Sequence, residues 1–288
     1  MQNWIGELTK PAIVLIEKVS DAIGGGFRPF QIKRVARAEA EADRIKAITQ
    51  IETQIEITDL TRRALGRFLI EESKKQDNME SITSKALPLL EDGSNPQEIS
   101  DDWITNFFDK CRLISDEEMQ ALWAKVLAGE ANAPGKYSKR TVNFLGSLDK
   151  SDAVLFATLC GSVWFIGGYV PLIYDLESSI YIDHGISFDV LKHLDDIGLL
   201  RFEGLTGYKR MGIPKRITFF YYSSPINIEF ANEENNVIEI GKVLFSKTGQ
   251  ELGPICDSKP IPGFLDYVIK YWIKKGLILS SPYPRAPE

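Results

Sequence analysis

One stretch of this chain constrains its fold more than any other, the segment between Pro29 and Asn78. It contains no further proline and a single glycine, Gly66, and it is rich in Ala, Glu, Arg, Lys, Ile and Gln. Proline and glycine interrupt helices, whereas most of the enriched residues are strong helix formers. The segment therefore predicts one very long helix or two helices in series.

The middle of this segment carries an apolar seam, whose members are Ile45, Ile48, Ile51 and Ile55. Steps of three and four residues place these side chains on one narrow helix face, which is the pattern of a coiled-coil contact. We expect the chain to self-associate through this seam. A broader apolar face follows and is suited to packing inside a helical bundle; it consists of Leu60, Ala64, Leu65, Phe68 and Leu69.

The rest of the first half is also predicted to be helical. An amphipathic helix over residues 4–23 has Pro11 in an early turn and ends at a run of three glycines, which predicts a hinge. Apolar residues recur at helical spacing over residues 103–113, 119–127, 138–148 and 151–163. Ser115 and Glu118 form a capping-box pattern before the second of these helices.

The second half changes character after Trp164, where aromatic and β-branched runs begin. These runs predict strands at residues 169–174, 180–182, 217–222, 226–230 and 237–245. Helices are predicted at 187–200 and 264–273, and Thr248 with Glu251 forms a second capping-box pattern. The fold class is therefore α+β, with an all-α N-terminal half of long helices. We expect an amphipathic helix and hinge at 1–27, a helical-bundle domain at 28–150 and an α+β domain at 151–288.

The order of motifs in the second half resembles winged-helix domains. The resemblance rests on a helix opening with Asp152-Ala153-Val154, on the helix at 187–200 that ends in Gly-Leu-Leu, and on a strand leading into Thr248-Gly249-Gln250-Glu251-Leu252. It implies a C-terminal winged-helix-like α/β unit with antiparallel strands.

Other motifs resemble an uncharacterised bacterial family, a domain of unknown function. They are ARAEAEA at residues 36–42, Asp101-Asp102-Trp103, and SDEEMQALWAKVLAGE at residues 115–130. The helix with Leu122-Trp123-Ala124-Lys125 and the alanine-rich opening are also similar to Abi-alpha type abortive-infection proteins. That similarity implies a link to phage defence. Neither resemblance brings a known catalytic residue with it.

Charge and cysteine content limit the function classes. The formal net charge of -6 over 288 residues argues against a protein that coats nucleic acid through bulk electrostatics. Three cysteines without a C-x-x-C pair, and two histidines, build neither a disulfide framework nor a zinc finger, so a reducing compartment is expected. The apolar run at 11–16 is too short to span a bilayer. We therefore expect a cytoplasmic protein, peripheral to the inner membrane if the first helix binds lipid.

No catalytic residue, metal-ligand set or cofactor is predicted. The segment from Gly129 to Ser138 superficially resembles a phosphate-binding loop, but its glycines are too far apart, Tyr137 occupies the hydroxyl position, and a helix precedes it. The acidic groups Asp101-Asp102 and 116–118 lie at helix starts, where we expect them to cap helices rather than to hold a metal.

Two basic groups are candidate contacts for nucleic acid or anionic lipid. The first surrounds the start of the long helix and comprises Arg28, Lys33, Arg34, Arg37, Arg44 and Lys46. The second lies where a wing would project and comprises Lys209, Arg210, Lys215 and Arg216. The helix that would enter a DNA groove carries Asp189, Asp195 and Asp196, which phosphates would repel.

Three functions follow, in ranked order. The first is a non-enzymatic, self-associating interaction protein, a sensor, adaptor or effector in bacterial antiphage defence, with a second copy or another protein as partner. The second is a DNA-binding winged-helix regulator that uses the basic groups. The third is a membrane-associated effector that uses the N-terminal amphipathic helix.

Overall fold

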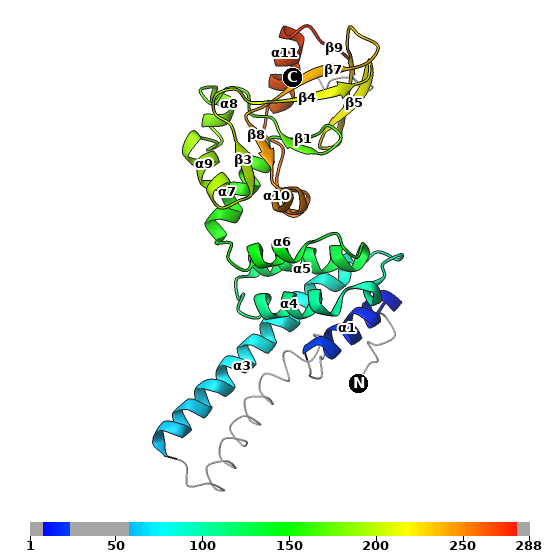
Figure 1. The fold of residues 1–288 in the computed structure, drawn as a ribbon. Coiled ribbons are helices and arrows are strands. Elements are labelled where there is room, and N and C mark those ends of the chain that lie inside the picture. The colour runs from blue at the N-terminus through cyan, green and yellow to red at the C-terminus, as the bar shows by residue number, and fades with distance from the viewer. Residues whose placement is uncertain (1–7, 24–57, 281–288) are drawn as a thin grey trace. The chain divides into compact units, whose positions relative to one another are not determined.

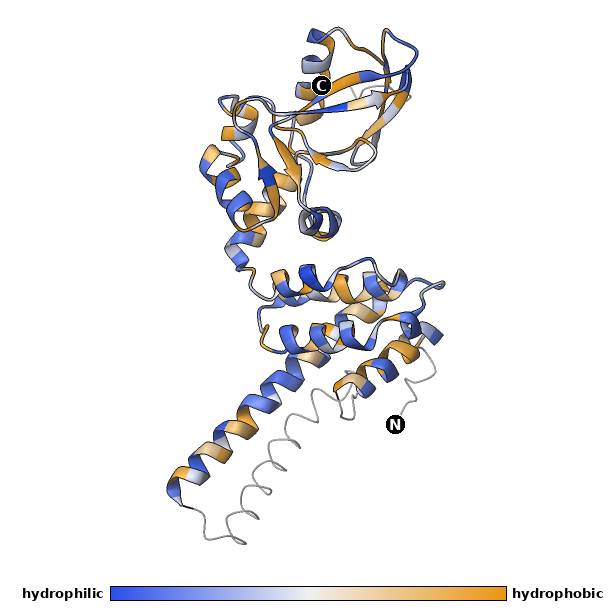
Figure 2. Cartoon of the chain, in the orientation of Figure 1, coloured by the Kyte–Doolittle hydropathy of each residue, from blue (hydrophilic) through white to orange (hydrophobic). Residues whose placement is uncertain are grey.

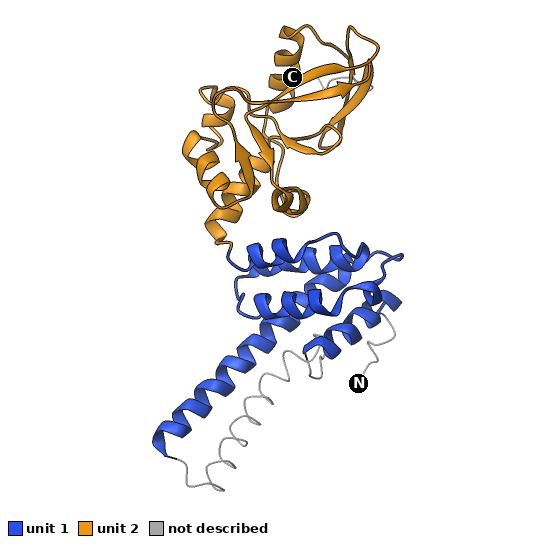
Figure 3. Cartoon of the chain, viewed as in Figure 1, with its two compact units in different colours: residues 1–147 blue, residues 148–288 orange. Residues whose placement is uncertain are grey.

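The structure is a computed structural model that describes residues 8–23 and 58–280 (Figure 1). The chain divides into two compact units, residues 1–147 and residues 148–288 (Figure 3). The described part of the first unit is helical, and the second combines short helices with antiparallel strands. The predicted α+β class is therefore confirmed. Within the described ranges, none of the helices combines the length and apolarity that crossing a bilayer requires.

The first unit is a helical bundle with an aromatic centre. Its described helices are α1 (Lys10–Ile23), α3 (Asp59–Ala86), α4 (Asp101–Cys111), α5 (Glu117–Asn132) and α6 (Lys139–Leu145), with short 3-10 turns η2 (Leu87–Leu89) and η3 (Pro96–Glu98). The second half of α3 packs on α5, α4 packs on α6, and α1 lies against α4 and η3. Phe107 lies between two tryptophans, with ring centroids 5.1 Å from Trp103 and 5.0 Å from Trp123. These stacked and edge-on rings bury the apolar faces that helical periodicity predicted.

Side-chain caps fix the starts of these helices. Ser138 Oγ accepts from the Thr141 amide at the start of α6. At α5, Asp116 is the N-cap, and its carboxylate accepts from the amides of Glu118 and Met119. The predicted capping box of Ser115 and Glu118 is therefore wrong by one residue. A carboxylate satisfies two free amides at once and also interacts favourably with the helix dipole.

The described part of the second unit contains five helices, three β-sheets and one 3-10 turn. The helices are α7 (Lys150–Cys160), α8 (Ser179–Ile182), α9 (Phe188–Asp196), α10 (Lys247–Leu252) and α11 (Phe264–Lys274), and the turn is η4 (Gly253–Ile255). The strands are β1 (Val163–Phe165), β2 (Tyr169–Pro171), β3 (Leu200–Phe202), β4 (Tyr208–Ile213), β5 (Arg216–Tyr221), β6 (Ser224–Glu229), β7 (Asn236–Gly241), β8 (Val243–Phe245) and β9 (Ile278–Ser280). A five-stranded antiparallel sheet has the order β2-β1-β5-β6-β9, while β3 pairs with β8 and β4 with β7.

Helix α11 packs through Trp272 on the buried side chains of the five-stranded sheet. The Trp272 ring lies 4.8 Å from that of Trp164 on β1 and 6.0 Å from that of Phe219 on β5. Successive strand residues point to opposite faces, so their neighbours Phe165 and Phe220 lie on the other face and are exposed. The sheet therefore has one buried face and one partly open face.

The segment between β3 and β8 differs from a simple wing. β3 and β8 pair directly, with Leu200 opposite Phe245 and Phe202 opposite Val243. The residues between them form β4 to β7, of which β5 and β6 belong to the five-stranded sheet. The segment between β3 and β8 is thus part of the folded sheets and does not form a single projecting hairpin.

Two local predictions in this unit are wrong, and a third predicted strand is present as two strands. Residues 180–182 form helix α8 instead of a strand, because the Tyr181 side chain is buried and its hydroxyl donates to Leu172 O at 2.8 Å. Helix α10 is capped by Ser246, which accepts from the Gly249 amide, and not by a box of Thr248 and Glu251. The run at 237–245 is divided into β7 and β8 after Gly241.

Candidate interaction surface

Helix α3 carries an exposed apolar stripe near its start, and the same face is buried near the end of the helix, beyond the charged residues Glu71 and Lys75. Residues spaced three or four apart share a helix face, so Leu60, Ala64 and Phe68 lie on the same side of α3 as Ile82 and Ala86. Ile82 and Ala86 are fully buried, whereas Leu60 is 69% and Phe68 56% exposed. Figure 1 shows this first half of α3 extending beyond the bundle, and Figure 2 shows apolar residues along it.

The predicted packing of this face inside a bundle is therefore wrong for Leu60, Ala64 and Phe68. Leu65 and Leu69 on the adjoining flank are half-buried. Ile70 is 52% exposed and lies outside the stripe, about 120° around the helix axis from Ala64. Large side chains left in water at helical spacing mark a surface for another apolar face.

Charged residues of both signs flank the stripe. Arg63 pairs with Asp59 at 3.2 Å, and Arg67 pairs with Glu71 at 3.5 Å, both between exposed side chains. Such exposed pairs contribute about 0.3–0.5 kcal/mol each to a helix. Along α3, the arginines Arg63 and Arg67 lie in the first turns, and the carboxylates Glu71 and Glu72 lie in the next turn.

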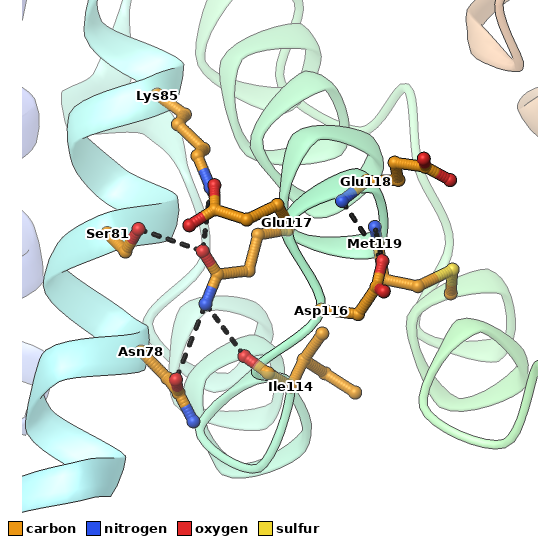
Figure 4. A network of polar contacts seen from close by, with 9 residues as sticks. Asn78, Ser81, Lys85, Ile114, Asp116, Glu117, Glu118 and Met119 are labelled. Atoms are coloured by element: carbon orange, nitrogen blue, oxygen red, sulfur yellow. Dashed lines mark hydrogen bonds and ion pairs between the residues drawn. The ribbon is translucent and has the colours of Figure 1, made fainter. Parts of the chain in front are cut away.

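A buried polar network anchors the other half of α3 on α5 (Figure 4). Gln120 Oε1 accepts from Ser81 Oγ at 2.8 Å and from Lys85 Nζ at 2.7 Å, and its Nε2 donates to Ile114 O at 2.9 Å. Asn78 joins the network by donating to Arg112 O at 2.8 Å. Because α3 can satisfy these partners in only one register, the network fixes the direction in which the exposed half projects.

The segment resembling a phosphate-binding loop is closed by a carboxylate of the chain itself. Glu130 is buried, and its two oxygens accept from the amides of Gly135 at 2.7 Å and Tyr137 at 2.8 Å. Trp103 Nε1 donates to Tyr137 O at 2.8 Å. A buried carboxylate occupies the amides that a phosphate would need, so this loop is a structural turn.

The acidic groups at helix starts are used for caps and ion pairs. Asp101 pairs with Lys18 at 2.5 Å, Asp102 pairs with Lys139 at 3.2 Å, and Asp116 caps α5. Within residues 8–23 and 58–280, no group of three or more His, Cys, Asp or Glu side chains is arranged to hold a metal ion.

The structure gathers the second basic group on the β4–β5 hairpin but pairs half of it with carboxylates. Lys215 lies 2.6 Å from Glu233, and Arg216 lies 3.2 Å from Glu229. The Arg210 guanidinium lies against the backbone of Gly167. These carboxylates reduce the positive potential that a phosphate backbone would meet.

The remaining predicted site residues lie outside the described residues. They are the isoleucine seam, Ile45, Ile48, Ile51 and Ile55, and the first basic group, Arg28, Lys33, Arg34, Arg37, Arg44 and Lys46. Both stay predictions.

Sequence reasoning missed two side-chain pairs in the second unit. His193 Nε2 on α9 lies 2.8 Å from Asp152 Oδ1 on α7, and a hydrogen bond with the Cys160 side chain lowers the pKa of the Cys256 thiol. Members of each pair are far apart in the chain, so no spacing pattern could reveal them.

Comparison with known proteins gives one match. A family model described as protein of unknown function (DUF2806) matches residues 62–269. The chain belongs to this family. No curated protein and no solved structure matches it. The predicted membership of a domain-of-unknown-function family is therefore confirmed, and the match includes Phe68, Gln120, Glu130, Cys160 and Cys256.

Proposed function

We propose that this DUF2806 protein is a non-enzymatic interaction protein that self-associates through the exposed stripe of α3. One observation supports the proposal above all others: a single face of one continuous helix is fully buried at Ile82 and largely exposed at Leu60 and Phe68. Burying a large apolar side chain contributes about 1.5–3 kcal/mol, so covering two per copy is a substantial driving force.

The charges beside the stripe favour a second copy of this chain as its occupant. In an antiparallel pair of α3 helices, Arg63 and Arg67 of one copy would lie beside Glu71 and Glu72 of the other. Contact between the copies would exchange the exposed ion pairs that these residues now make within α3 for pairs across the interface. A two-fold axis makes such a contact self-complementary, since each copy supplies both ends. In a parallel pair, like charges would instead lie side by side.

The experiment is light scattering coupled to size exclusion on the full chain at micromolar concentration. We expect a defined oligomer, and we expect Leu60→Glu with Phe68→Glu to raise its dissociation constant at least about tenfold. Ile70→Glu is the matched control, because it makes the same change at an exposed apolar residue of the same helix, about 120° around the axis from Ala64. A full chain that is monomeric throughout, or an Ile70→Glu variant that dissociates as readily, would contradict the proposal.

The alternative functions have less support. A DNA-binding role depends on a basic group in which Lys215 and Arg216 already have carboxylate partners. A membrane role depends on the first helix, where Ala12, Leu15 and Val19 are buried within the first unit. The link to phage defence rests on the sequence resemblance alone and is separate from the self-association proposed here.

A further inference from the structure

A groove of about 460 Å³ lies in the second unit against the open face of the five-stranded sheet. The segment after α10 lines its other side. Four aromatic side chains line the groove, and between 37% and 42% of each is exposed: Phe165, Tyr169, Phe220 and Tyr222. Single exposed rings are common on protein surfaces, whereas four rings around one groove of this size indicate a site for a small organic molecule.

Three of the rings come from adjacent strands of the sheet. Phe165 on β1 and Phe220 on β5 lie side by side, because these two residues are paired across the strands. Tyr169, at the start of β2, packs against Phe165 with ring centroids 5.4 Å apart and ring planes inclined by 66°. Two rings inclined in this way form adjoining walls, which suit a compact, rounded group better than a flat ring system.

The fourth ring belongs to Tyr222, in the turn between β5 and β6. Tyr222 has φ of 50°, in the left-handed region that hairpin turns usually fill with Gly, Asn or Asp. Its hydroxyl lies 2.9 Å from Ser258 Oγ and 3.4 Å from Cys160 O, so the ring is held against the segment after α10. A tyrosine in a costly backbone conformation, with its side chain fixed in a groove, is typical of a functional site.

The charge of the groove selects the charge of its ligand. Among the described residues that line the groove, Asp257 is charged and none is basic. The faces of aromatic rings carry partial negative charge, and they attract cations that lie within about 6 Å of the ring centre. A carboxylate beside four such rings therefore favours an organic cation and disfavours a phosphate or carboxylate ligand.

We propose that this groove binds a small molecule that carries a quaternary ammonium group. An ammonium with N–H groups loses hydrogen bonds to water when it enters a cluster of rings, and the ring faces do not replace these bonds fully. A trimethylammonium group has no N–H, so its methyl groups contact the rings while its charge is attracted to the ring faces and to Asp257. The groove lies wholly in the second unit, and the proposal is independent of self-association through α3.

The test is isothermal titration calorimetry on full-length protein with choline as probe. The comparison ligand is the neutral alcohol in which carbon replaces the nitrogen of choline. This alcohol has the same shape as choline but no charge, so its binding measures what apolar contact alone contributes. We expect choline to bind at least about tenfold more tightly than the alcohol.

Two variants remove the features that recognise the charge. Phe220→Leu keeps an apolar side chain but removes a ring, so it is expected to weaken choline binding at least about fivefold and to change binding of the alcohol little. Asp257→Asn removes the carboxylate and should also weaken choline binding; asparagine tolerates the φ of 56° at this position. Phe188→Leu is the matched control, because Phe188 is 58% exposed on α9 and lies outside the groove. Thermal unfolding checks that each variant is folded.

The proposal is overturned if the alcohol binds as tightly as choline, since the groove would then be a purely apolar site. It is also overturned if choline at millimolar concentration does not bind, or if Phe188→Leu weakens binding as much as Phe220→Leu. A peptide that carries trimethyllysine offers the same chemistry from another source. If this peptide binds more tightly than choline, the occupant is a methylated protein side chain and the assignment to a free small molecule is wrong.

Discussion

Ser81 on α3 donates a hydrogen bond to Gln120 on α5, at 2.8 Å between Ser81 Oγ and Gln120 Oε1, and both side chains are buried. The Nε2 group of Gln120 donates to Ile114 O and lies 3.3 Å from Asn78 Oδ1. One amide therefore joins α3, α5 and the turn that leads from α4 into α5. Gln120 is therefore one of the side chains that fix the direction in which the exposed half of α3 projects.

Gln120→Leu is expected to lower the free energy of unfolding by about 2 kcal/mol or more. Leucine keeps much of the volume but leaves the buried Ser81 hydroxyl and the half-buried Ile114 O without their partner, and a fully buried group of this kind costs about 1–3 kcal/mol. Urea denaturation measures the loss. Gln97→Leu, the same change at an exposed position, is the control and should alter stability by less than about 0.5 kcal/mol. Equal effects of the two substitutions would contradict the assigned role of the network.

Glu130→Gln is expected to destabilise the turn after α5. The carboxylate accepts from two amides, and replacing one oxygen by an amino group turns an acceptor into a donor that faces another donor. We expect a loss of about 1–3 kcal/mol, measured by thermal unfolding. Glu98→Gln, at an exposed site, serves as control. Stabilisation of wild type by inorganic phosphate at this loop would show that the turn is more than structural.

Gly241→Ala is expected to damage the second unit severely. Gly241 has φ of 90°, and a Cβ there would lie 2.3 Å from Ile173 O, in the isolated β-bridge between Ile173 and Gly241. Gly212→Ala separates the two causes, because Gly212 also has a positive φ of 72° but nothing within 4 Å of a Cβ. We expect about 1–2 kcal/mol for Gly212→Ala and clearly more for Gly241→Ala. If both unfold at the same urea concentration, the close contact is unimportant.

Glu239 is expected to stabilise the protein in a pH-dependent manner. Its pKa is lowered chiefly by the hydrogen bond from Lys275 at 2.9 Å, and then by that from the Tyr271 hydroxyl at 2.7 Å. A lowered pKa in the folded state gives stability that is present above the unfolded value of about 4.3 and is lost as pH falls through the lower folded value. Glu239 is partly exposed, so solvent screening limits the effect to about 1 kcal/mol or less.

The check compares wild type with Glu239→Gln in urea at neutral pH and at a pH below the folded value. The variant should be less stable at neutral pH, and the difference should shrink in acid. Glu234→Gln, on an exposed turn, is the control. A difference that stays constant with pH would mean that Glu239 acts through packing rather than through its charge.

Helical periodicity predicted α4 and α5 from the sequence because their buried residues recur every three or four positions. The same reading placed Leu122 in the buried face of α5 and overlooked Gln120, although Gln120 is the more deeply buried. A polar residue in a core is specified by its partners on other elements, and α3 and the turn at Ile114 are such partners. Sequence periodicity contains no information about them.

Other differences between the predictions and the structure have the same origin. The spacing of Leu60, Ala64 and Phe68 predicted a buried face. Periodicity shows that a helix has an apolar face, but it does not show which part of the protein covers that face. Ile180, Tyr181 and Ile182 are typical strand residues, and the buried Tyr181 hydroxyl, bonded to Leu172, holds them in a helix instead. The aromatic groove depends on β1, β5 and the segment after α10 lying together, so no spacing pattern predicted it.

Strand β9, at residues 278–280, completes the five-stranded sheet by pairing with β6. During synthesis, β1, β2, β5 and β6 leave the ribosome before β9. The backbone amides and carbonyls at the outer edge of β6 therefore lack their β9 partners until β9 has also emerged. An open edge with apolar residues such as Ile226 and Ile228 nearby can pair with another chain. Until Ser280 has emerged and β9 pairs with β6, this edge is therefore open to pairing with another chain.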